Sequence, residues 1–344
     1  MANILYGING EGSGHSTRSK EVITHLINSG HKVTVATSGR GLNLNKYFPV
    51  EEIFGFNFVY TKGRVNEFRS FFENLDVFPG ATKSLRKLSG LIHNKKIDLI
   101  ITDFEPITSY LSNVRRIPAI SINNQHFISR TKAVCPKHYR TQANLTKAGI
   151  ELMTPGAEAY LVLSFFEAKV KDKKTFIVPP ILRREVLDLK PSEGDYVLIY
   201  LTHGFENLTQ LLRGVSARFT VYGSNEDQQE GNITFKKFSE EAFLKDLAGA
   251  GAVFATAGFS LISEALHLGK PFLAWPIDNQ FEQVFNAYHL DRLGYGKWIK
   301  DPSREAIEGF LSDLPAYRKK LSRYPRRDNQ LLFSKLDQLM IDLL

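Results

Sequence analysis

The chain contains a single cysteine, Cys135, among its 344 residues, so it cannot form an internal disulfide. A lone cysteine fits a reducing compartment, and we interpret it as an incidental thiol rather than a nucleophile. No run of about 18 apolar residues occurs, which argues against a membrane-spanning helix. The first ten residues are typical of a strand that enters a loop, and they lack the layout of a signal peptide. These absences predict a cytoplasmic protein.

Acidic residues are outnumbered, with 36 Asp and Glu against 44 Lys and Arg, which gives a formal net charge of +8. An excess of positive charge favours anionic partners such as nucleotide phosphates or a lipid surface. The chain has no zinc finger, no RNP-type strand and no long Lys/Arg run, so we expect no nucleic-acid partner. The paired arginines at 115–116, 183–184 and 326–327 are interpreted as solvated surface.

Several nucleotide and metal motifs are missing. The glycine loop Gly7–His15 reads GINGEGSGH and follows the first predicted strand. The dinucleotide fingerprint Gly-x-Gly-x-x-Gly fails there because its last position falls on His15 or Thr17, and no Gly-Lys-Ser/Thr of a P-loop occurs. No Asp-x-Asp occurs either, which argues against a metal-dependent donor site of that kind. We therefore expect neither a dehydrogenase nor a bound metal or resident cofactor.

Short apolar runs alternate with helical stretches along the first half of the chain. Continuous apolar runs are typical of parallel strands covered on both faces, so the pattern predicts a doubly wound α/β domain. The predicted strands are Ile4–Ile8, Lys32–Ala36, Phe56–Tyr60, Leu99–Thr102, Ala119–Ile122 and Ala159–Leu163. The predicted helices are Thr17–Ser29, Thr82–Asn94, Pro106–Val114 and Lys137–Met153.

The alternation restarts after a proline-rich stretch near Thr175–Ser192, and the length of the chain suits two domains. We predict an N-terminal acceptor-binding domain over residues 1–178, a linker over 179–194 and a C-terminal donor domain over 195–322. A C-terminal helix over 323–344 is expected to return to the N-terminal domain. The predicted architecture is two Rossmann-like, doubly wound domains facing a central cleft, with C-terminal helices packing back across the hinge.

The segment Ala257–Ala287, AGFSLISEALHLGKPFLAWPIDNQFEQVFNA, carries the strongest local signal. A strand-like run leads to Gly258, where a phosphate can approach the backbone, and the next helix offers unpaired N–H groups at its N-terminus. Glu264 lies on the second turn, where a carboxylate can accept hydrogen bonds from ribose hydroxyls. A polar cluster then follows a second short strand: Asp278, Asn279, Gln280 and Gln283. The order of these groups predicts a nucleotide-sugar site, with a helix cap and a polar loop as the plainer alternative.

His15 ends the glycine loop at the sheet edge where open α/β domains bind ligands. Its imidazole can act as a general base at neutral pH if another group orients the second ring nitrogen. Asp103 directly follows the predicted strand Leu99–Thr102, so it reaches the same edge and is the best partner. A capping or phosphate-binding role for His15 is the alternative. Acceptor contacts are predicted at Gly12, Ser13, Gly14 and His126.

Together these motifs resemble a GT-B glycosyltransferase, and most closely the group of the cell-wall enzyme that adds N-acetylglucosamine to lipid-linked muramyl peptide. The resemblance is specific over Phe238–Gly296 and loose elsewhere. It implies that the N-terminal domain binds the acceptor and that the C-terminal domain binds a nucleotide diphosphate sugar, with Phe238 at the base. The implied donor-binding residues are Thr202, His203, Gly204, Phe238, Gly258, Phe259, Ser260, Glu264, Asp278, Asn279, Gln280 and Gln283.

Two positions depart from that group. The chain has Thr202-His203-Gly204 where a Gly-Gly-Ser type of sequence is usual. It also has Glu282 where the cell-wall enzyme has a second glutamine. The second departure weakens any transfer of that enzyme's donor-sugar specificity to this chain.

The resemblance implies an inverting, metal-independent transfer from a nucleotide sugar, with UDP as the expected nucleotide. His15 with Asp103 would take the proton of the acceptor hydroxyl, and the helix N-terminus at Gly258 would stabilise the leaving diphosphate. The implied acceptor is a lipid or cell-envelope glycan, reached by peripheral contact with the inner face of the cytoplasmic membrane. Two alternatives stay open: a non-hydrolysing sugar-nucleotide epimerase, and a non-catalytic protein that binds sugar nucleotides.

The segment Phe54–Phe78 is rich in aromatic and cationic side chains. Aromatic rings beside cations suit a membrane edge or a lipid-acceptor surface. The alternation of Phe54, Phe56, Phe58 and Tyr60 is also typical of one buried strand face. The sequence leaves both interpretations open.

Overall fold

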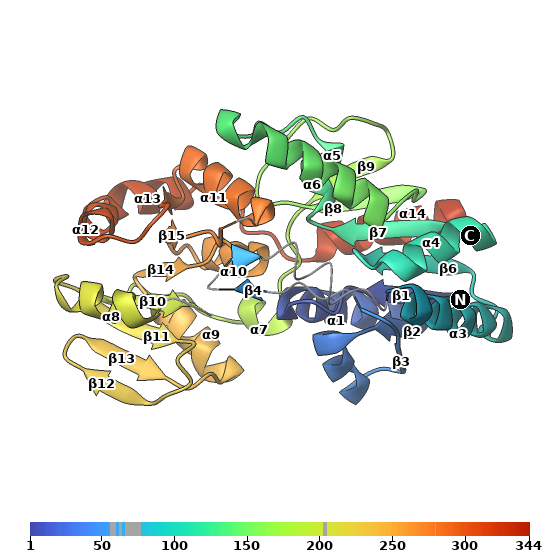
Figure 1. Cartoon of the computed structure of the whole chain (residues 1–344), viewed down its shortest axis with the longest axis horizontal. Helices are drawn as coiled ribbons and strands as arrows, with labels where there is room; N and C mark the ends of the chain where they lie inside the picture. The colour runs from blue at the N-terminus through green and yellow to red at the C-terminus, as the bar shows by residue number, and fades with distance from the viewer. Residues whose placement is uncertain (56–59, 62–63, 66–76, 202–204, 279) are drawn as a thin grey trace. The chain divides into compact units, whose positions relative to one another are not determined.

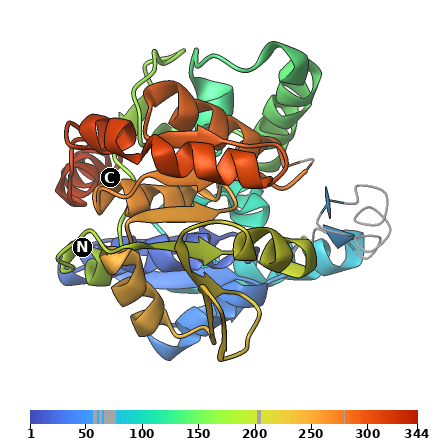
Figure 2. The same ribbon diagram turned by 90° about the vertical axis from the view of Figure 1, so that its left-hand side faces the viewer.

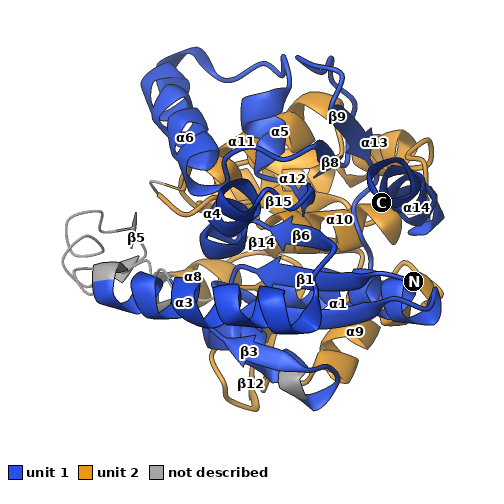
Figure 3. Cartoon of the chain, turned by 90° about the vertical axis from the view of Figure 1, so that its right-hand side faces the viewer, with its two compact units in different colours: residues 1–59, 66–183, 327–344 blue, residues 60–65, 184–326 orange. Residues whose placement is uncertain are grey.

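The computed structural model describes residues 1–55, 60–61, 64–65, 77–201, 205–278 and 280–344. The chain divides into two compact units (Figure 3). Unit 1 comprises residues 1–59, 66–183 and 327–344, and unit 2 comprises residues 60–65 and 184–326. Each unit contains a seven-stranded sheet with helices between its strands, so the predicted doubly wound α/β class is confirmed for both.

The sheet of unit 1 has the strand order β3-β2-β1-β6-β7-β8-β9, and its neighbouring strands are all parallel. The inner strands β6, β7 and β8 are buried along their whole length, which explains their continuous apolar sequence. The strands are β1 (Asn3–Ile8), β2 (Lys32–Thr37), β3 (Val50–Glu52), β6 (Leu99–Asp103), β7 (Ala119–Asn123), β8 (Ala159–Leu163) and β9 (Thr175–Val178).

Helices cover both faces of this sheet (Figure 1). The chain moves from β1 to β2 in one direction and from β6 to β7 in the other, so right-handed crossovers place their two helices on opposite faces. The first of these helices is α1 and the second is α4, which packs on β1 and β6. The helices are α1 (Ser13–Asn28), η1 (Gly39–Lys46), α3 (Val77–Lys95), α4 (Pro106–Arg115), α5 (His126–Arg130), η2 (Lys137–Tyr139), α6 (Arg140–Met153) and α14 (Gln330–Leu343).

The last helix, α14, is part of unit 1. The side chain of Asn329 donates to the carbonyl of Leu182 at 2.7 Å and accepts from the Leu182 amide at 2.9 Å. The His25 ring of α1 stacks on Phe333 with centroids 4.2 Å apart, and its Nε2 lies 2.9 Å from Asp337 Oδ1. The apolar stripe of α14 is buried, so the helix closes the core of the unit whose first strand begins the chain.

The sheet of unit 2 has the order β12-β13-β11-β10-β14-β15-β16, with β12 antiparallel and the rest parallel. Figure 2 turns this unit toward the viewer. Its strands are β10 (Tyr196–Tyr200), β11 (Arg218–Tyr222), β12 (Gln228–Glu230), β13 (Ile233–Lys236), β14 (Ala252–Ala255), β15 (Phe272–Ala274) and β16 (Gly296–Trp298). Its helices are α7 (Arg184–Leu187), α8 (Phe205–Arg213), α9 (Glu240–Gly249), α10 (Phe259–His267), α11 (Phe281–Leu293), α12 (Arg304–Ser312) and α13 (Leu314–Leu321).

The structure differs from the sequence-based prediction in a few elements. The strand beside β2 is Val50–Glu52, whereas Phe56–Tyr60 was predicted, and residues 56–59 lie outside the described part of the chain. The proline-rich stretch begins with an edge strand, β9, which joins the sheet of unit 1. The hairpin β4 (Tyr60–Thr61) and β5 (Arg64–Val65) forms a separate two-stranded sheet. None of the helices in the described ranges combines the length and hydropathy needed to cross a bilayer.

Replacement of Asn329 tests how α14 is anchored. Asn329→Ala leaves a buried amide and a buried carbonyl of Leu182 without their partners, so we expect the free energy of unfolding to fall by about 2–4 kcal/mol. Chemical denaturation followed by circular dichroism measures the change. Gln338→Ala on the exposed side of α14 is the control and should stay within about 0.5 kcal/mol of the wild type. An Asn329→Ala protein as stable as that control would show that these two hydrogen bonds do not hold the helix.

Candidate functional site

In unit 1 the first strand, β1, lies between β2 and β6, and the strand order reverses at this point. Ile8 at the end of β1 is paired with Asp103 at the end of β6. Ligands of open α/β sheets bind at the carboxyl ends of the strands where the order reverses. The loop after β1 and the carboxylate of Asp103 at the end of β6 therefore both lie at the sheet edge where ligands bind in this type of fold.

Two glycines shape the loop between β1 and α1. A Cβ on Gly10 would lie 2.2 Å from the carbonyl oxygen of Ser38, so only glycine fits against that backbone. Gly12 has φ of 77° and is the N-cap of α1, where no side chain of the described residues caps the helix. The helix begins at Ser13 rather than at the predicted Thr17. His15 is therefore on the first helical turn and not in the loop.

The structure brings His15 and Asp103 together. His15 Nδ1 lies 2.8 Å from Asp103 Oδ1, and the side chains are 13% and 1% exposed, respectively. No described residue forms a hydrogen bond with the other ring nitrogen, Nε2. A carboxylate that holds Nδ1–H leaves the lone pair of Nε2 available to accept a proton. Beside this pair, Gly12 and Ser13 are exposed and Gly14 is half-buried on the same turn of α1.

Arg18 and Ser19 complete the surroundings of Asp103, and sequence reasoning did not single them out. Arg18 donates from Nε to Asp103 Oδ2 at 2.7 Å and from Nη2 to Oδ1 at 2.5 Å, and Ser19 Oγ donates to Oδ2 at 3.1 Å. Burial raises the pKa of the Asp103 carboxyl, but Arg18 and then His15 outweigh burial and hold that pKa at about 2. The signal was present as His-x-x-Arg-Ser, because positions i, i+3 and i+4 share one helix face.

A turn with an unusual backbone holds Asp103 in place. Phe104 has φ of 56°, a left-handed conformation that costs a residue with a side chain roughly 1 kcal/mol. Asn9 after β1 binds both sides of this turn, because its backbone N–H donates to Asp103 O and its Nδ2 donates to Phe104 O. The buried carboxylate of Glu105 then caps α4 by accepting from the amides of Ile107 and Thr108.

His126 was predicted to contact the acceptor, but its placement gives it a structural role. The residue is 1% exposed and begins α5, a short helix that the sequence did not indicate. Its Nδ1 lies 3.0 Å from Asn123 Oδ1, and its Nε2 lies 3.3 Å from Thr154 Oγ1. Burial first, and the charge of Arg130 second, lower the pKa of His126 to about 3. The ring is thus a neutral core group whose two nitrogens already have partners.

Unit 2 repeats the arrangement of sheet and loops with different side chains. The strands β14 and β15 are parallel, with Ala255 paired to Ala274, so the segments that follow them emerge at one edge. Gly258 is the N-cap of α10, and as a glycine it has no side chain with which to cap this helix itself. A Cβ on Gly258 would have no heavy atom of the described residues within 4 Å, so among these residues there is open space beside Gly258. The dipole of α10 favours an anion at this end of the helix.

The other predicted donor residues of α10 differ in their exposure. Ser260 is half-buried on the first turn, and Phe259 beside it is 7% exposed. Glu264 on the second turn is 4% exposed and takes part in interactions within the chain. The Glu264 carboxylate is therefore buried against neighbouring residues of the chain, and contacts within the protein help to hold it in place.

The polar cluster after β15 is held by side chains of α11. Gln283 Oε1 accepts from the Ile277 amide at 3.0 Å, which folds the turn back onto the helix. Asn286, which the sequence analysis did not select, donates to the Ala257 carbonyl at 3.1 Å and so ties this turn to the Gly258 turn. Asp278 is exposed, and Gln280 is the N-cap of α11.

Phe238 follows β13 at the same edge of the sheet and is 54% exposed. Its ring lies against Phe243 and Tyr200, with centroids 5.7 and 6.0 Å away. An aromatic face held in this way can stack on a base. The remaining predicted donor residues lie outside the described part of the chain: Thr202, His203, Gly204 and Asn279.

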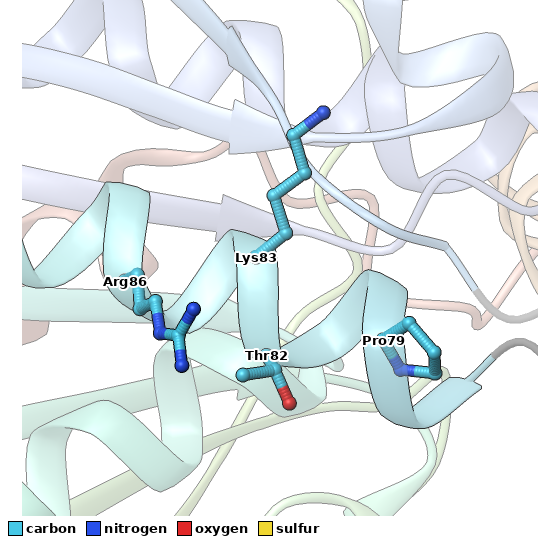
Figure 4. A pocket seen from close by; sticks show the side chains of 4 residues that line it. All are labelled: Pro79, Thr82, Lys83 and Arg86. Carbon is cyan, nitrogen blue, oxygen red and sulfur yellow. The ribbon is translucent and has the colours of Figure 1, made fainter.

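Two surface hollows formed by described residues lie away from these positions. One of about 490 Å³ lies along α3, where Pro79, Thr82 and Arg86 extend to one side and Lys83 to the other (Figure 4). Another, of about 680 Å³, is lined by Arg213 and Arg218, and it lies at the opposite edge of the unit 2 sheet from Gly258. Both are open surface features, and neither contains a predicted site residue. Among the described residues, no group of three or more His, Cys, Asp or Glu side chains could hold a metal ion.

Comparison with known proteins assigns the chain to a family. The sequence profile described as glycosyl transferase family 1 matches residues 2–315, which is most of its length. The chain belongs to this glycosyltransferase family. A curated relative, an uncharacterized glycosyltransferase of Methanosarcina acetivorans, is 24% identical over 369 aligned residues, covering 95% of this chain and 94% of the relative.

Solved structures show the same fold for this glycosyltransferase. The glycosyltransferase of kitacinnamycin superposes with a TM-score of 0.72 at 18% identity, covering 100% of this chain and 99% of that one. Arabidopsis thaliana UGT89C1, solved in complex with UDP-L-rhamnose, gives a TM-score of 0.70 at 16% identity and 99% coverage of both chains. The expected GT-B fold class is therefore confirmed.

The buried His126 predicts how the stability of this glycosyltransferase depends on pH. Its folded-state pKa lies below the ordinary 6.5, so below pH 6.5 the unfolded chain binds a proton that the folded chain excludes. Stability is then lost as the pH falls from 6.5 toward 3, at up to about 1.4 kcal/mol per pH unit. We expect His126→Gln to flatten the dependence of unfolding free energy on pH between 6.5 and 5, in urea titrations. The exposed control His138→Gln should keep the wild-type slope, and equal slopes in all three proteins would contradict this account.

Proposed function

We propose that the protein is an inverting glycosyltransferase that moves a hexosyl or N-acetylhexosaminyl group from a nucleotide diphosphate sugar to an acceptor hydroxyl. The observation that carries the proposal is the contact between His15 and Asp103 at the carboxyl edge of the unit 1 sheet. A base at this edge is what a direct displacement at the anomeric carbon requires. We assign the acceptor to unit 1 and the donor to unit 2.

The proposed step uses His15 as the general base. Its Nε2 takes the proton of the acceptor hydroxyl while the acceptor oxygen forms a bond to the anomeric carbon. The bond from that carbon to the diphosphate oxygen breaks, and its electron pair leaves with the nucleoside diphosphate. Asp103 orients the imidazole through Nδ1 and stabilises the charge that forms on it, and the proton passes to solvent afterwards. Attack opposite to the leaving group gives inversion.

The donor assignment rests on the glycine N-cap of α10, Gly258, and on the open space that the described residues leave beside it. A diphosphate there gains the backbone N–H groups and the helix dipole, which can stabilise the leaving group without a metal. Phe238 is assigned to the base, Glu264 to the ribose, and Asp278, Gln280 and Gln283 to the sugar. We propose UDP as the nucleotide, in line with the UDP-L-rhamnose bound by UGT89C1.

Separate variants of the two units test the division of roles. His15→Ala should lower the rate of transfer by about 10²–10⁴-fold, the usual contribution of a general base, and leave nucleotide binding unchanged. Glu264→Ala and Gly258→Val should instead weaken binding of UDP in isothermal titration calorimetry. A glycosyl-transfer assay against a panel of UDP-, GDP- and dTDP-sugars measures the rate. Transfer at the wild-type rate by His15→Ala would refute the base assignment.

The same panel separates this proposal from its two rivals. A non-hydrolysing epimerase interconverts the donor sugar without an acceptor, so product analysis by NMR would show a changed stereocentre in the nucleotide sugar. A non-catalytic binding protein would give calorimetric binding with neither transfer nor interconversion. Retention of anomeric configuration in the product would contradict the inverting step. Loss of transfer on treatment with EDTA, restored by a divalent cation, would contradict metal independence.

For the acceptor we propose a lipid-linked hydroxyl compound, reached by peripheral contact with an anionic membrane surface. The support is a basic strip between Asp313 and Asp328, which contains no acidic residue and carries six of the chain's net eight positive charges. Its members are Arg318, Lys319, Lys320, Arg323, Arg326 and Arg327. Arg318 pairs with Glu193, whereas the other five are exposed and form no ion pair with a described residue. Such clusters bind anionic lipid at about 1 kcal/mol per cation.

Vesicle flotation tests the role of the basic strip. The triple variant Lys319→Glu, Lys320→Glu, Arg323→Glu should lower partitioning onto phosphatidylglycerol vesicles by roughly 100-fold, since three favourable charges are lost. The control Lys132→Glu, Lys137→Glu, Arg140→Glu makes the same change in net charge on exposed residues of unit 1 and should bind nearly as the wild type does. Equal loss in both variants, or wild-type binding to neutral phosphatidylcholine vesicles, would contradict a specific role for the strip.

A further inference from the structure

Arg18 contacts both members of the proposed dyad. Its Nη2 lies 2.5 Å from Asp103 Oδ1 and 2.8 Å from His15 Nδ1, while His15 Nδ1 lies 2.8 Å from the same carboxylate oxygen. A positive and a negative group are thus equally close to one ring nitrogen. In a simple His–Asp pair only the carboxylate lies at that distance from the ring. Here the positive charge of Arg18 offsets part of the negative electrostatic potential that Asp103 produces at the imidazole.

Each of the three guanidinium nitrogens of Arg18 donates a hydrogen bond to a protein oxygen. Nε donates to Asp103 Oδ2 at 2.7 Å, and Nη1 donates to Asn124 Oδ1 at 2.7 Å. Arg18 and Asn124 are each 5% exposed, and Asn124 directly follows β7, the strand next to β6. A buried arginine with a two-point contact to a carboxylate keeps its charge and its orientation. Its position relative to His15 is therefore a built feature of α1, β6 and β7.

We propose that Arg18 is a positioning residue that cancels the charge of Asp103 toward His15 and so keeps the imidazole neutral, with its proton on Nδ1 and Nε2 available as the base. This inference rests on the proposed role of His15. Asp103 alone would favour the imidazolium, because an opposite charge close to a titratable group favours its charged form. The charge of Arg18 at the same distance opposes that effect.

The tautomer follows from the same contacts. Nε and Nη2 of Arg18 each have a carboxylate oxygen to donate to, and Nη1 has Asn124. Nδ1–H of His15 can then donate to Asp103, which leaves the lone pair on Nε2. In the other tautomer Nδ1 would accept from Arg18, and Nε2 would carry a proton and could not act as a base. Tyr6 of β1 is a further titratable group near Asp103, and its pKa is raised by burial and by Asp103.

The pH–rate profile of transfer tests the charge effect. In Arg18→Gln, which can still donate to Asp103 but has no charge, we expect the acid limb of kcat/KM to move up by about one pH unit or more. The rate should fall at pH 6.5 and recover toward the wild-type value near pH 9. Arg18→Lys keeps the positive charge but cannot make the two-point contact with the Asp103 carboxylate. The pH of the acid limb of kcat/KM should therefore stay at the wild-type value, with a lower kcat at every pH. A fall by the same factor at all pH values in Arg18→Gln would show a merely structural role and overturn the proposal.

NMR of the substrate-free protein tests the inference without any activity. With ¹⁵N-labelled histidine, His15 of the wild type should show the Nδ1–H form near pH 7, and its imidazole should titrate at higher pH in Arg18→Gln. His15→Ala supplies the assignment, and Arg18→Lys serves if Arg18→Gln does not fold. The Nε2–H form in the wild type, or an unchanged titration in Arg18→Gln, would overturn the proposal. A wild type with this titration but no transfer from any nucleotide sugar would refute the proposed function and leave the role of Arg18 intact.

Discussion

The carboxylate of Asp103 is 1% exposed, and it accepts hydrogen bonds from three side chains of α1. A charged group in such a place is stable only if it is paired and its lone pairs are used, and removal of one partner of such a pair typically costs 3–5 kcal/mol. This requirement fixes the rotation of α1 about its axis, because His15, Arg18 and Ser19 reach the carboxylate only from one helix face. It also fixes the ends of β1, β6 and β7 relative to one another.

The two units place their functional groups by the same topological rule. In each sheet the first strand lies inside the sheet, and the strand order reverses beside it. A helix with a glycine N-cap follows β1 in unit 1, and another follows β14, the neighbour of β10, in unit 2. The difference lies in what surrounds that helix. In unit 1 the first turn carries a histidine beside a buried ion pair, which suits proton transfer. In unit 2 the described residues leave open space beside Gly258 at the N-terminus of α10, which suits an anion.

Much of this arrangement can be predicted from the sequence. Buried parallel strands appear as continuous apolar runs, and Asp103 and His15 could be paired because strand ends meet at one edge. The start of α1 could not be placed from the sequence, because Ser13-Gly14-His15 has weak helix propensity. The contacts of His15 and Arg18 with Asp103, which the sequence does not show, favour a helix that begins at Ser13. With the start misplaced, Arg18 and Ser19 could not be assigned to the face of His15. His126 was misjudged because a five-residue helix such as α5 leaves no periodic signal.

The return of α14 to unit 1 has a consequence for the order in which the protein forms on the ribosome. Unit 2 is a nearly continuous stretch of chain that is complete once residue 326 has emerged, whereas unit 1 lacks α14 until residues 327–344 have been made. Domains that are continuous in sequence can fold during synthesis. The surface of the first sheet that α14 will cover therefore stays exposed to water until residues 330–343 have been made. The half that is translated first is the half that is completed last.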